Sequence, residues 1–256
     1  MPKMKADTLI EIEAPELASI TVGIVGTEPF ICNRMSEKAK RQLLAPAGKK
    51  TAADKQANLK HDPVAEYRAS FYRTDDPGDG PVIQCLASMF KGAMMTAALD
   101  MPGAKKTQIG RLVWVQGYMR PLWGVPRLFM SVTRSADINR TPDIRTRAII
   151  PQWATMLTVE FVSNLVTAKT VVNLLDQGGR SSGVGDWRPE KGKGTFGQFR
   201  VVARPEDDED FLRIREAGGA AAQQAAIDSP VPFDEDSRDL LDWYTEEVAK
   251  RGKAAS

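Results

Sequence analysis

A glycine-rich stretch at residues 171–200 constrains the fold of this chain more than any other segment. Its pattern predicts the end of a helix, then a long loop, then a short strand. Glycine has no Cβ, so such a loop can turn sharply and lie close to another molecule, and its free N–H groups favour anions. Cations and one aromatic side chain accompany the glycines: Arg180, Trp187, Arg188, Lys191 and Lys193. Together these features predict a surface for a polyanion with stackable bases.

The composition is that of an ordinary globular protein. The chain has 256 residues, of which 42% are hydrophobic and 27% are charged. No apolar run reaches the roughly 20 residues that span a bilayer, and the first residues lack the apolar core of a secretion signal. Cys32 and Cys85 are too few for a disulfide framework or a zinc site. We therefore expect a cytoplasmic protein with reduced thiols, no metal and no cofactor.

Charge is distributed unevenly along the chain. Residues 205–256 hold 14 acidic and 6 basic side chains, a net charge of −8, which leaves a net charge of +10 on the rest. A basic body with an acidic tail is typical of nucleic-acid binders whose tail docks a partner or masks the binding surface. The alternative is that the tail only increases solubility.

Hydrophobic periodicity predicts alternating strands and helices. The predicted strands are 8–13, 17–26, 109–119, 127–133, 153–162 and 195–202. One predicted helix begins at Ser36, and three others cover 86–99, 167–179 and 234–251. For the helix at 167–179, Thr167 is a possible N-cap and Gly178 and Gly179 are stop signals. The alanine-rich residues 216–232 predict a low-complexity linker.

Two further basic segments interrupt this pattern. An insertion at residues 30–80 carries Arg34, Lys38 and Arg41 and is lysine-rich over 45–63; it is either a solvated surface or an arm along a phosphate backbone. The connector 134–148 carries Arg140, Arg145 and Arg147 and is either a solvated hairpin or a projecting phosphate-binding hairpin. His61 is the only histidine, and its polar loop argues against a catalytic role.

The order of these elements predicts an α+β fold. A β-α-β-β-α-β order is typical of ferredoxin-like, RRM-type sheets with both helices on one face, and the open face commonly binds single strands. The acidic helix at the C-terminal end presents Trp243 and Tyr244, residue types favoured at protein interfaces.

Two motifs resemble the RAMP superfamily over roughly residues 8–203. The segment GPVIQCLASMFKGAMMTAAL resembles its first helix, although only Ser88 remains of the usual serine pair and Met95 or a neighbour replaces the arginine. GVGDWRPEKGKGTFGQF resembles its glycine-rich loop. The chain, including EPFICNRM and RTRAIIPQW, also resembles a family of phage-encoded proteins of uncertain function.

This resemblance implies a fold like that of CRISPR effector backbone subunits. Ser88 and Lys91 would lie at the first helix, Arg140, Arg145 and Arg147 in a thumb-like hairpin (134–148), and residues Arg180 through Lys193 in the loop. We expect a RAMP-like domain at 1–204 and an acidic linker and helix at 205–256.

The predicted function is single-stranded nucleic-acid binding, largely independent of sequence, with DNA favoured over RNA. The protein would self-associate along the strand in phage replication or recombination and would not be an enzyme. The alternative is a structural or interaction subunit, either a phage assembly component or an inhibitor that mimics a CRISPR backbone subunit. Its partner would dock on the acidic tail.

Overall fold

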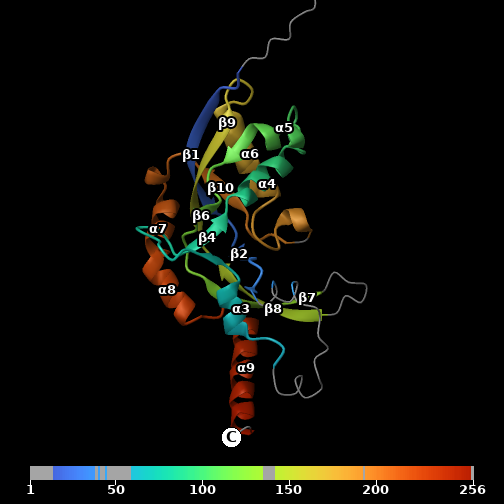
Figure 1. Cartoon of the computed structure of the whole chain (residues 1–256), viewed down its shortest axis with the longest axis vertical. Helices are drawn as coiled ribbons and strands as arrows, with labels where there is room; N and C mark the ends of the chain where they lie inside the picture. The colour runs from blue at the N-terminus through green and yellow to red at the C-terminus, as the bar shows by residue number, and fades with distance from the viewer. Residues whose placement is uncertain are drawn as a thin grey trace, which may run out of the picture.

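The computed structural model describes residues 14–37, 40, 44, 59–134, 142–192 and 194–254. They form an elongated body from which the last helix, α9 (Glu235–Ala254), extends at one end (Figure 1). The fold is mixed α+β, and its sheets are antiparallel. The expected α+β class is therefore confirmed. No helix within the described residues is long and apolar enough to cross a membrane.

The central sheet has the strand order β10-β1-β9-β5. Its strands are β1 (Leu17–Gly26), β5 (Val113–Val115), β9 (Ala154–Val162) and β10 (Phe199–Val202). β1 is a central strand because Ile24 lies between Thr155 of β9 and Val201 of β10. The strands predicted at 17–26 and 153–162 are confirmed, and the one predicted at 8–13 lies outside the described residues.

Helices cover both faces of this sheet (Figure 1). On one face, α4 (Ser88–Ala97) packs against α6 (Ala168–Ser181), and Phe90 and Leu174 are fully buried there. On the other face, α7 (Glu209–Ala217) buries Phe211 against Trp123 and the β1 side chains. The expectation of an open, strand-binding sheet face is therefore wrong over this region, because α7 covers it.

Two smaller sheets extend the body. β2 (Phe30–Ile31), β8 (Pro142–Ile150) and β7 (Arg127–Arg134) form one, in that order. The other is β3 (Tyr72–Arg73), β4 (Ile83–Leu86) and β6 (Met119–Pro121). The connector predicted as a hairpin is formed by β7 and β8, which pair from Arg127 with Ile149 to Arg134 with Pro142. Its tip, including Arg140, lies outside the described residues.

Several predicted boundaries are wrong. Residues predicted to start a strand at 109 belong to α5 (Lys106–Leu112), because Ile109 turns into the core and Gly110 lies against Met95 of α4. The strand predicted at 195–202 begins only at Phe199. Of the helix predicted from Ser36, Glu37, Lys40 and Leu44 are helical, and Ser36 itself precedes the helix; the other residues from 38 to 58 lie outside the described ones. The helix α3 (Pro63–Ala69), capped by Asp62, was not predicted.

Gly178 and Gly179 do not end their helix, which continues to Ser181. A Cβ on Gly178 would lie 2.8 Å from the Ala93 backbone, and one on Gly179 would lie 2.2 Å from the Phe199 carbonyl oxygen. These glycines therefore allow α6 to approach α4 and β10 closely. The helix ends where Gly183 adopts a φ of 65°, a left-handed conformation that glycine tolerates. The predicted N-cap is confirmed, since the Thr167 side chain accepts a hydrogen bond from Thr170 N.

The segment predicted as a linker is folded onto the body. Residues 216–232 contain the end of α7 and all of α8 (Ala220–Asp228). The helix predicted at 234–251 is confirmed as α9. Gln223 is fully buried: its side chain accepts a hydrogen bond from Ile83 N and donates to the carbonyl oxygens of Leu122 and Gly124. Alanine favours helix formation, and its small side chain permits this close docking. Two 3₁₀ turns complete the elements, Pro189–Lys191 and Pro205–Asp207.

Candidate nucleic-acid interface

The glycine-rich loop, residues 182–197, is held by its own backbone and by β2. Val184 N donates to Gly197 O at 2.9 Å, Gly197 N to Pro29 O at 2.8 Å, and Asp186 N to Ile31 O at 3.1 Å. A Cβ on Gly197 would lie 1.7 Å from the Val184 carbonyl oxygen. Close packing within the loop thus requires glycine at position 197. The backbone N–H groups of Val184, Asp186 and Gly197 are already hydrogen-bonded, so they are not free for a ligand. The expectation of a flexible loop with bare N–H groups is wrong at these positions.

An ion pair ties this loop to the β7–β8 hairpin. Arg147 of β8 contacts Asp186 of the loop, and the Arg147 side chain is only 11% exposed. Burial, and to a lesser extent the charge of Arg145, lowers the pKa of Arg147 to about 10, so the guanidinium stays charged at neutral pH. Arg147 therefore serves first as an anchor for the loop. Arg147 was predicted to bind phosphate.

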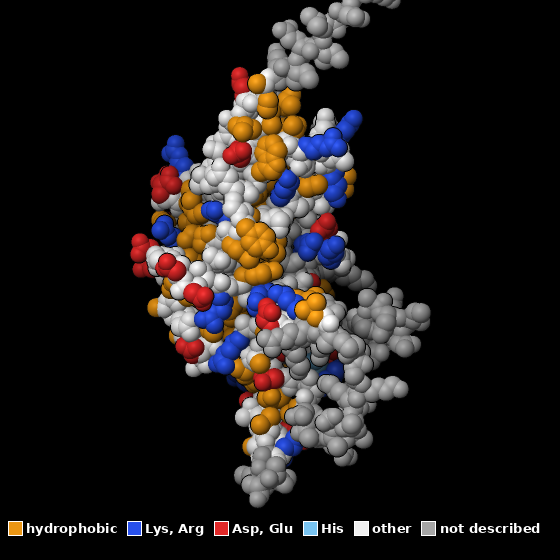
Figure 2. Space-filling model, viewed as in Figure 1, with side chains coloured by type: hydrophobic (Ala, Val, Ile, Leu, Met, Phe, Trp, Pro, Cys, Tyr) orange, Lys and Arg blue, Asp and Glu red, His pale blue; other side chains and the backbone are white. Residues whose placement is uncertain are grey.

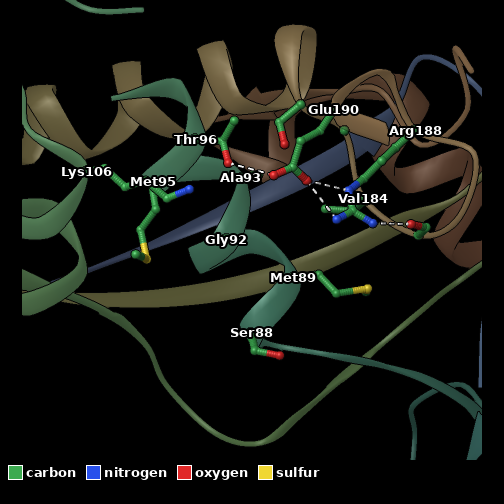
Figure 3. A pocket seen from close by; sticks show the side chains of 13 residues that line it. Ser88, Met89, Gly92, Ala93, Met95, Thr96, Lys106, Val184, Arg188 and Glu190 are labelled. Atoms are coloured by element: carbon green, nitrogen blue, oxygen red, sulfur yellow. Dashed lines mark hydrogen bonds and ion pairs between the residues drawn. The ribbon is translucent and has the colours of Figure 1, made fainter. Parts of the chain in front are cut away.

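A second cluster fixes Arg188 at the mouth of a pocket (Figure 3). Its Nε and Nη2 donate to Glu190 Oε2 at 2.9 and 2.7 Å, and its Nη1 donates to Gly185 O at 2.8 Å. Thr96 of α4 also donates to Glu190, at 3.0 Å. Burial alone would raise the pKa of Glu190, but the hydrogen bonds from Arg188 and Thr96 lower it overall. Glu190 is therefore a carboxylate that orients Arg188 toward α4.

Three neighbouring pockets form what we call the groove. The first, of about 230 Å³, lies between α4 and the loop and includes Ser88, Lys106 and Arg188. The middle pocket, of about 200 Å³, shares Met89, Gly185 and Arg188 with the first. The third, of about 430 Å³, shares Cys32, Asn33 and Ser70 with the middle one. These shared walls place the pockets in one row, from α5 to β8.

The third pocket contains both signs of charge. Arg34, Arg145 and Arg147 line it, together with His61, Glu66 and Asp143. His61 Nδ1 lies 2.7 Å from Glu66 Oε1, and its Nε2 lies 2.9 Å from Asp143 Oδ1. Because carboxylates hold both ring nitrogens, neither is free to take a proton from a bound substrate.

Asp143 is held ionised by its neighbours. Burial would raise the pKa of Asp143, but hydrogen bonds from Lys60 and His61 lower it overall. No group of three or more His, Cys, Asp or Glu within the described residues could hold a metal ion.

Some of the predicted residues line the groove and others do not. Arg34, Ser88, Arg145, Arg147 and Arg188 line it. Lys91 lies outside the three pockets, with its Nζ 5.8 Å from the centre of the Trp114 ring. Arg180 is 71% exposed and pairs with Asp176, and Lys191 is exposed at the 3₁₀ turn of the loop. Lys38, Arg41, Arg140 and Lys193 lie outside the described residues.

Trp187 stands at the outer side of the loop. Its side chain is 42% exposed, and its ring stacks on Phe196 at 6.0 Å and 11°. Phe129 of β7 and Phe233 continue this aromatic series. Trp187 has a φ of 54°, which is uncommon for a bulky residue. One face of the Trp187 ring packs against Phe196, and the exposed edge of the ring remains available to a ligand.

The two predicted partner-binding residues differ in their surroundings. Trp243 is 58% exposed on α9. Tyr244 is half-buried, and burial raises its pKa, with Asp62 and Glu66 adding to the effect. Tyr244 therefore packs near α3, while Trp243 points to solvent.

Sequence reasoning did not assign Asn33, Gln84 and Lys106 to the groove. They come from the end of β2, from β4 and from α5, and only the fold brings them together. On the face shown in Figure 2, Lys and Arg side chains lie over α5 and near the loop.

Comparisons with known proteins found no matching family model and no matching curated protein. Among solved structures, the chain is similar to Cmr6 from Pyrococcus furiosus, with 10% identity and a TM-score of 0.34 over 73% of this chain and 98% of that one. It is also similar to a chain of the Type III-B Cmr-beta complex bound to cognate target RNA, with 12% identity and a TM-score of 0.32. That alignment covers 72% of this chain and 61% of the other.

Proposed function

We propose that this protein binds single-stranded nucleic acid along the groove, largely independently of sequence. The observation that carries the proposal is the row of three pockets between the first helix of the sheet, the glycine-rich loop and the β7–β8 hairpin. Five cationic side chains line it against three carboxylates. The cations are Arg34, Lys106, Arg145, Arg147 and Arg188.

Two of these cations are best suited to phosphate. Within the described residues, neither Lys106 nor Arg145 forms an ion pair, and they lie in the first and third pockets. A strand that follows the groove would therefore meet an unneutralised cation near each end. Neutralising phosphates releases counterions, so binding would weaken steeply with salt. Trp187 lies outside the three pockets, next in sequence to Arg188, and its exposed edge offers a stacking surface that tolerates any base.

The fold proposal is a ferredoxin-like, RAMP-type core. The chain passes through the central sheet in the order β1, α4, β5, β9, α6, β10, and the spatial order is β10-β1-β9-β5 with both helices on one face. This path supports the β-α-β-β-α-β expectation. A DNA preference, assembly along the strand and a role in phage replication or recombination remain parts of the proposal that rest on the sequence resemblance.

We also propose that the protein is a binder without chemistry of its own. The proposal is supported by the contacts of His61, because each of its ring nitrogens lies within hydrogen-bond distance of a carboxylate, that of Glu66 or that of Asp143. A labelled single strand incubated with the protein and Mg²⁺ or Mn²⁺ would stay intact under this proposal, and cleavage that is lost in a His61→Ala variant would contradict it.

Binding can be tested by fluorescence anisotropy with single- and double-stranded DNA and RNA at two salt concentrations. Lys106→Ala with Arg145→Ala should lower affinity for all single strands alike and reduce the salt slope by about 0.7 per lost phosphate contact. Lys169→Ala with Arg204→Ala removes the same charge from exposed positions outside the three pockets and should change affinity little. Equal effects of the two double variants would contradict binding in the groove.

A second candidate function is that of an interaction subunit that docks through α9. Trp243 is exposed on this helix, and Asp239 and Glu246 lie one turn to either side of it. An exposed tryptophan surrounded by carboxylates suits a basic partner surface, including that of a second copy. Analytical ultracentrifugation of the wild type and of Trp243→Ala tests this, since self-association through α9 should be lost in the variant.

A further inference from the structure

The middle pocket of the groove differs in chemistry from its two neighbours. Phe30, Phe71, Tyr72 and Leu86 provide an apolar floor and wall. Its volume of about 200 Å³ is several times the roughly 30 Å³ that one water molecule occupies in the liquid. The pocket therefore has room for a flat apolar group. Among the described residues that line it, Arg188 is the one charged side chain, whereas each flanking pocket holds several.

The thiols in this pocket do not add charge. Cys32 and Cys85 are buried there, and burial raises the pKa of both, that of Cys85 to about 12. They remain neutral thiols at physiological pH, so the floor of the pocket stays uncharged.

Two side-chain amides stand at the walls of the pocket. Asn33 is exposed just after β2, and Gln84 is half-buried on β4. Within the described residues neither side-chain amide has a hydrogen-bond partner. Each amide offers an N–H donor beside a carbonyl acceptor, the pattern that pairs with the N6 and N7 edge of adenine. The pocket thus combines an apolar floor with unpaired groups suited to a base edge.

Cations stand on both sides of this pocket. Arg188 lies between it and the first pocket, and the guanidinium of Arg34 lies 5.7 Å from the centre of the Tyr72 ring on the side of the third. Arg188 and Arg34 each also pair with one carboxylate, that of Glu190 and that of Glu37. Phosphates held beside these two arginines would leave the intervening nucleotide over the middle pocket. Its base could then turn inward while the backbone stays on the cations.

We propose that the middle pocket receives one base of the bound strand, whose edge is read by Asn33 and Gln84, with adenine preferred. The inference rests on the proposed function, since it requires that a single strand follow the groove. It adds a selective position to a surface that otherwise contacts the backbone.

The test uses three 10-nucleotide DNA strands: one fully abasic, one abasic with a single central adenine, and one abasic with a single central thymine. A lone base can slide into the pocket because the rest of the strand has no bases to fix its register. The wild type should bind the adenine strand about tenfold more tightly than the fully abasic strand and about tenfold more tightly than the thymine strand.

Substitutions at Gln84 separate the parts of the inference. Gln84→Trp should fill the pocket, so the adenine and abasic strands bind equally. Gln84→Leu keeps the size of the side chain and should weaken the preference for adenine over thymine. Leu165→Trp adds a tryptophan at an exposed position outside the pockets and should behave as the wild type.

The outcomes distinguish this inference from the proposed function. If ordinary single strands bind but a single adenine does not raise the affinity of the abasic strand, the proposed base-binding role of the middle pocket is wrong and the groove proposal stands. The same holds if the adenine gain persists in folded Gln84→Trp. If no single strand binds to the wild type, both proposals are overturned.

Discussion

Arg147 on β8 and Asp186 in the glycine-rich loop form an ion pair that joins two segments almost forty residues apart in the sequence. The pair fixes the loop against the β7–β8 hairpin, and the adjacent hydrogen bond from Asp186 N to Ile31 O adds β2 to the same junction. Three elements that border the groove are thus held together at one point, so the shape of the groove depends on this contact.

Removing one partner of this pair should destabilise the protein. Arg147→Ala leaves the Asp186 carboxylate partly buried without its counter-ion, so the free energy of unfolding should fall by about 2–3 kcal/mol. Urea denaturation followed by circular dichroism measures it. Arg145→Ala, an exposed arginine on the same strand, should leave stability within about 0.5 kcal/mol of the wild type. A smaller loss for Arg147→Ala than for Arg145→Ala would show that the ion pair does not hold the loop.

Trp187 should contribute to strand affinity more than to stability. Trp187→Asn keeps a residue that tolerates positive φ, and it removes the exposed aromatic edge. Affinity for single strands should fall by about 1–2 kcal/mol, regardless of sequence, as measured by anisotropy titration. Phe196→Leu, which removes the ring beneath Trp187, should show part of the same loss. Unchanged affinity in both variants would exclude Trp187 as a stacking surface.

The docking of α8 should depend on one buried amide. Gln223→Leu leaves Ile83 N and the carbonyl oxygens of Leu122 and Gly124 without partners, so unfolding free energy should drop by about 2–4 kcal/mol. Gln224→Leu is the matched control, because within the described residues the Gln224 side chain bonds to the exposed side chains of Arg73 and Asp228 alone. If the two variants have equal stability, α8 is not held by Gln223.

Acid should weaken the attachment of α7 through Asp208. Hydrogen bonds from Arg200 lower the pKa of Asp208 below its usual 3.8, against the opposing effect of burial. A carboxyl group whose folded pKa is lowered adds stability above about pH 4, and this stability is lost as pH falls through the lowered value. Wild type should therefore exceed Asp208→Asn in unfolding free energy by about 1 kcal/mol at pH 7.

That difference should shrink as the pH falls below about 3.8 and through the lowered pKa of Asp208, which thermal melts across the acid range would reveal. Asp208→Ala should lose more than Asp208→Asn at all pH values. It also removes the side-chain cap on Phe211 N, whereas asparagine can replace that cap. A difference between wild type and Asp208→Asn that is constant with pH would contradict the role of the Arg200 pair.

Periodicity identified the elements that bury one clear apolar face. The strands at 17–26, 127–133 and 153–162 and the helices at 86–99 and 167–179 were predictable, because their apolar residues repeat with the spacing of a strand or a helix. α5 was missed because Ile109 and Val113 look like strand residues until α4 is placed above them.

The glycines show where local reasoning is insufficient. A glycine at the end of an apolar repeat reads as a helix stop, yet Gly178 and Gly179 lie inside α6 and meet the backbones of α4 and β10. Gly183, Gly194 and Gly197 likewise meet carbonyl oxygens of the loop itself, and Gly185 meets the carbonyl oxygen of Ile31 in β2. Close approach between segments distant in the chain leaves no mark in the local sequence pattern.

By itself, the sequence determined the α+β class, the glycine-rich loop after the second helix, the paired hairpin and the acidic end of the chain, because these depend on composition and short-range periodicity. Only the tertiary structure decided which cations meet. Arg34, Lys106, Arg145 and Arg188 come from four separate segments, Arg147 is engaged by Asp186, and Lys91 turns toward Trp114. The physical reason is that a binding groove is made by packing, and packing brings together residues whose separation in the sequence carries no information about their distance in space.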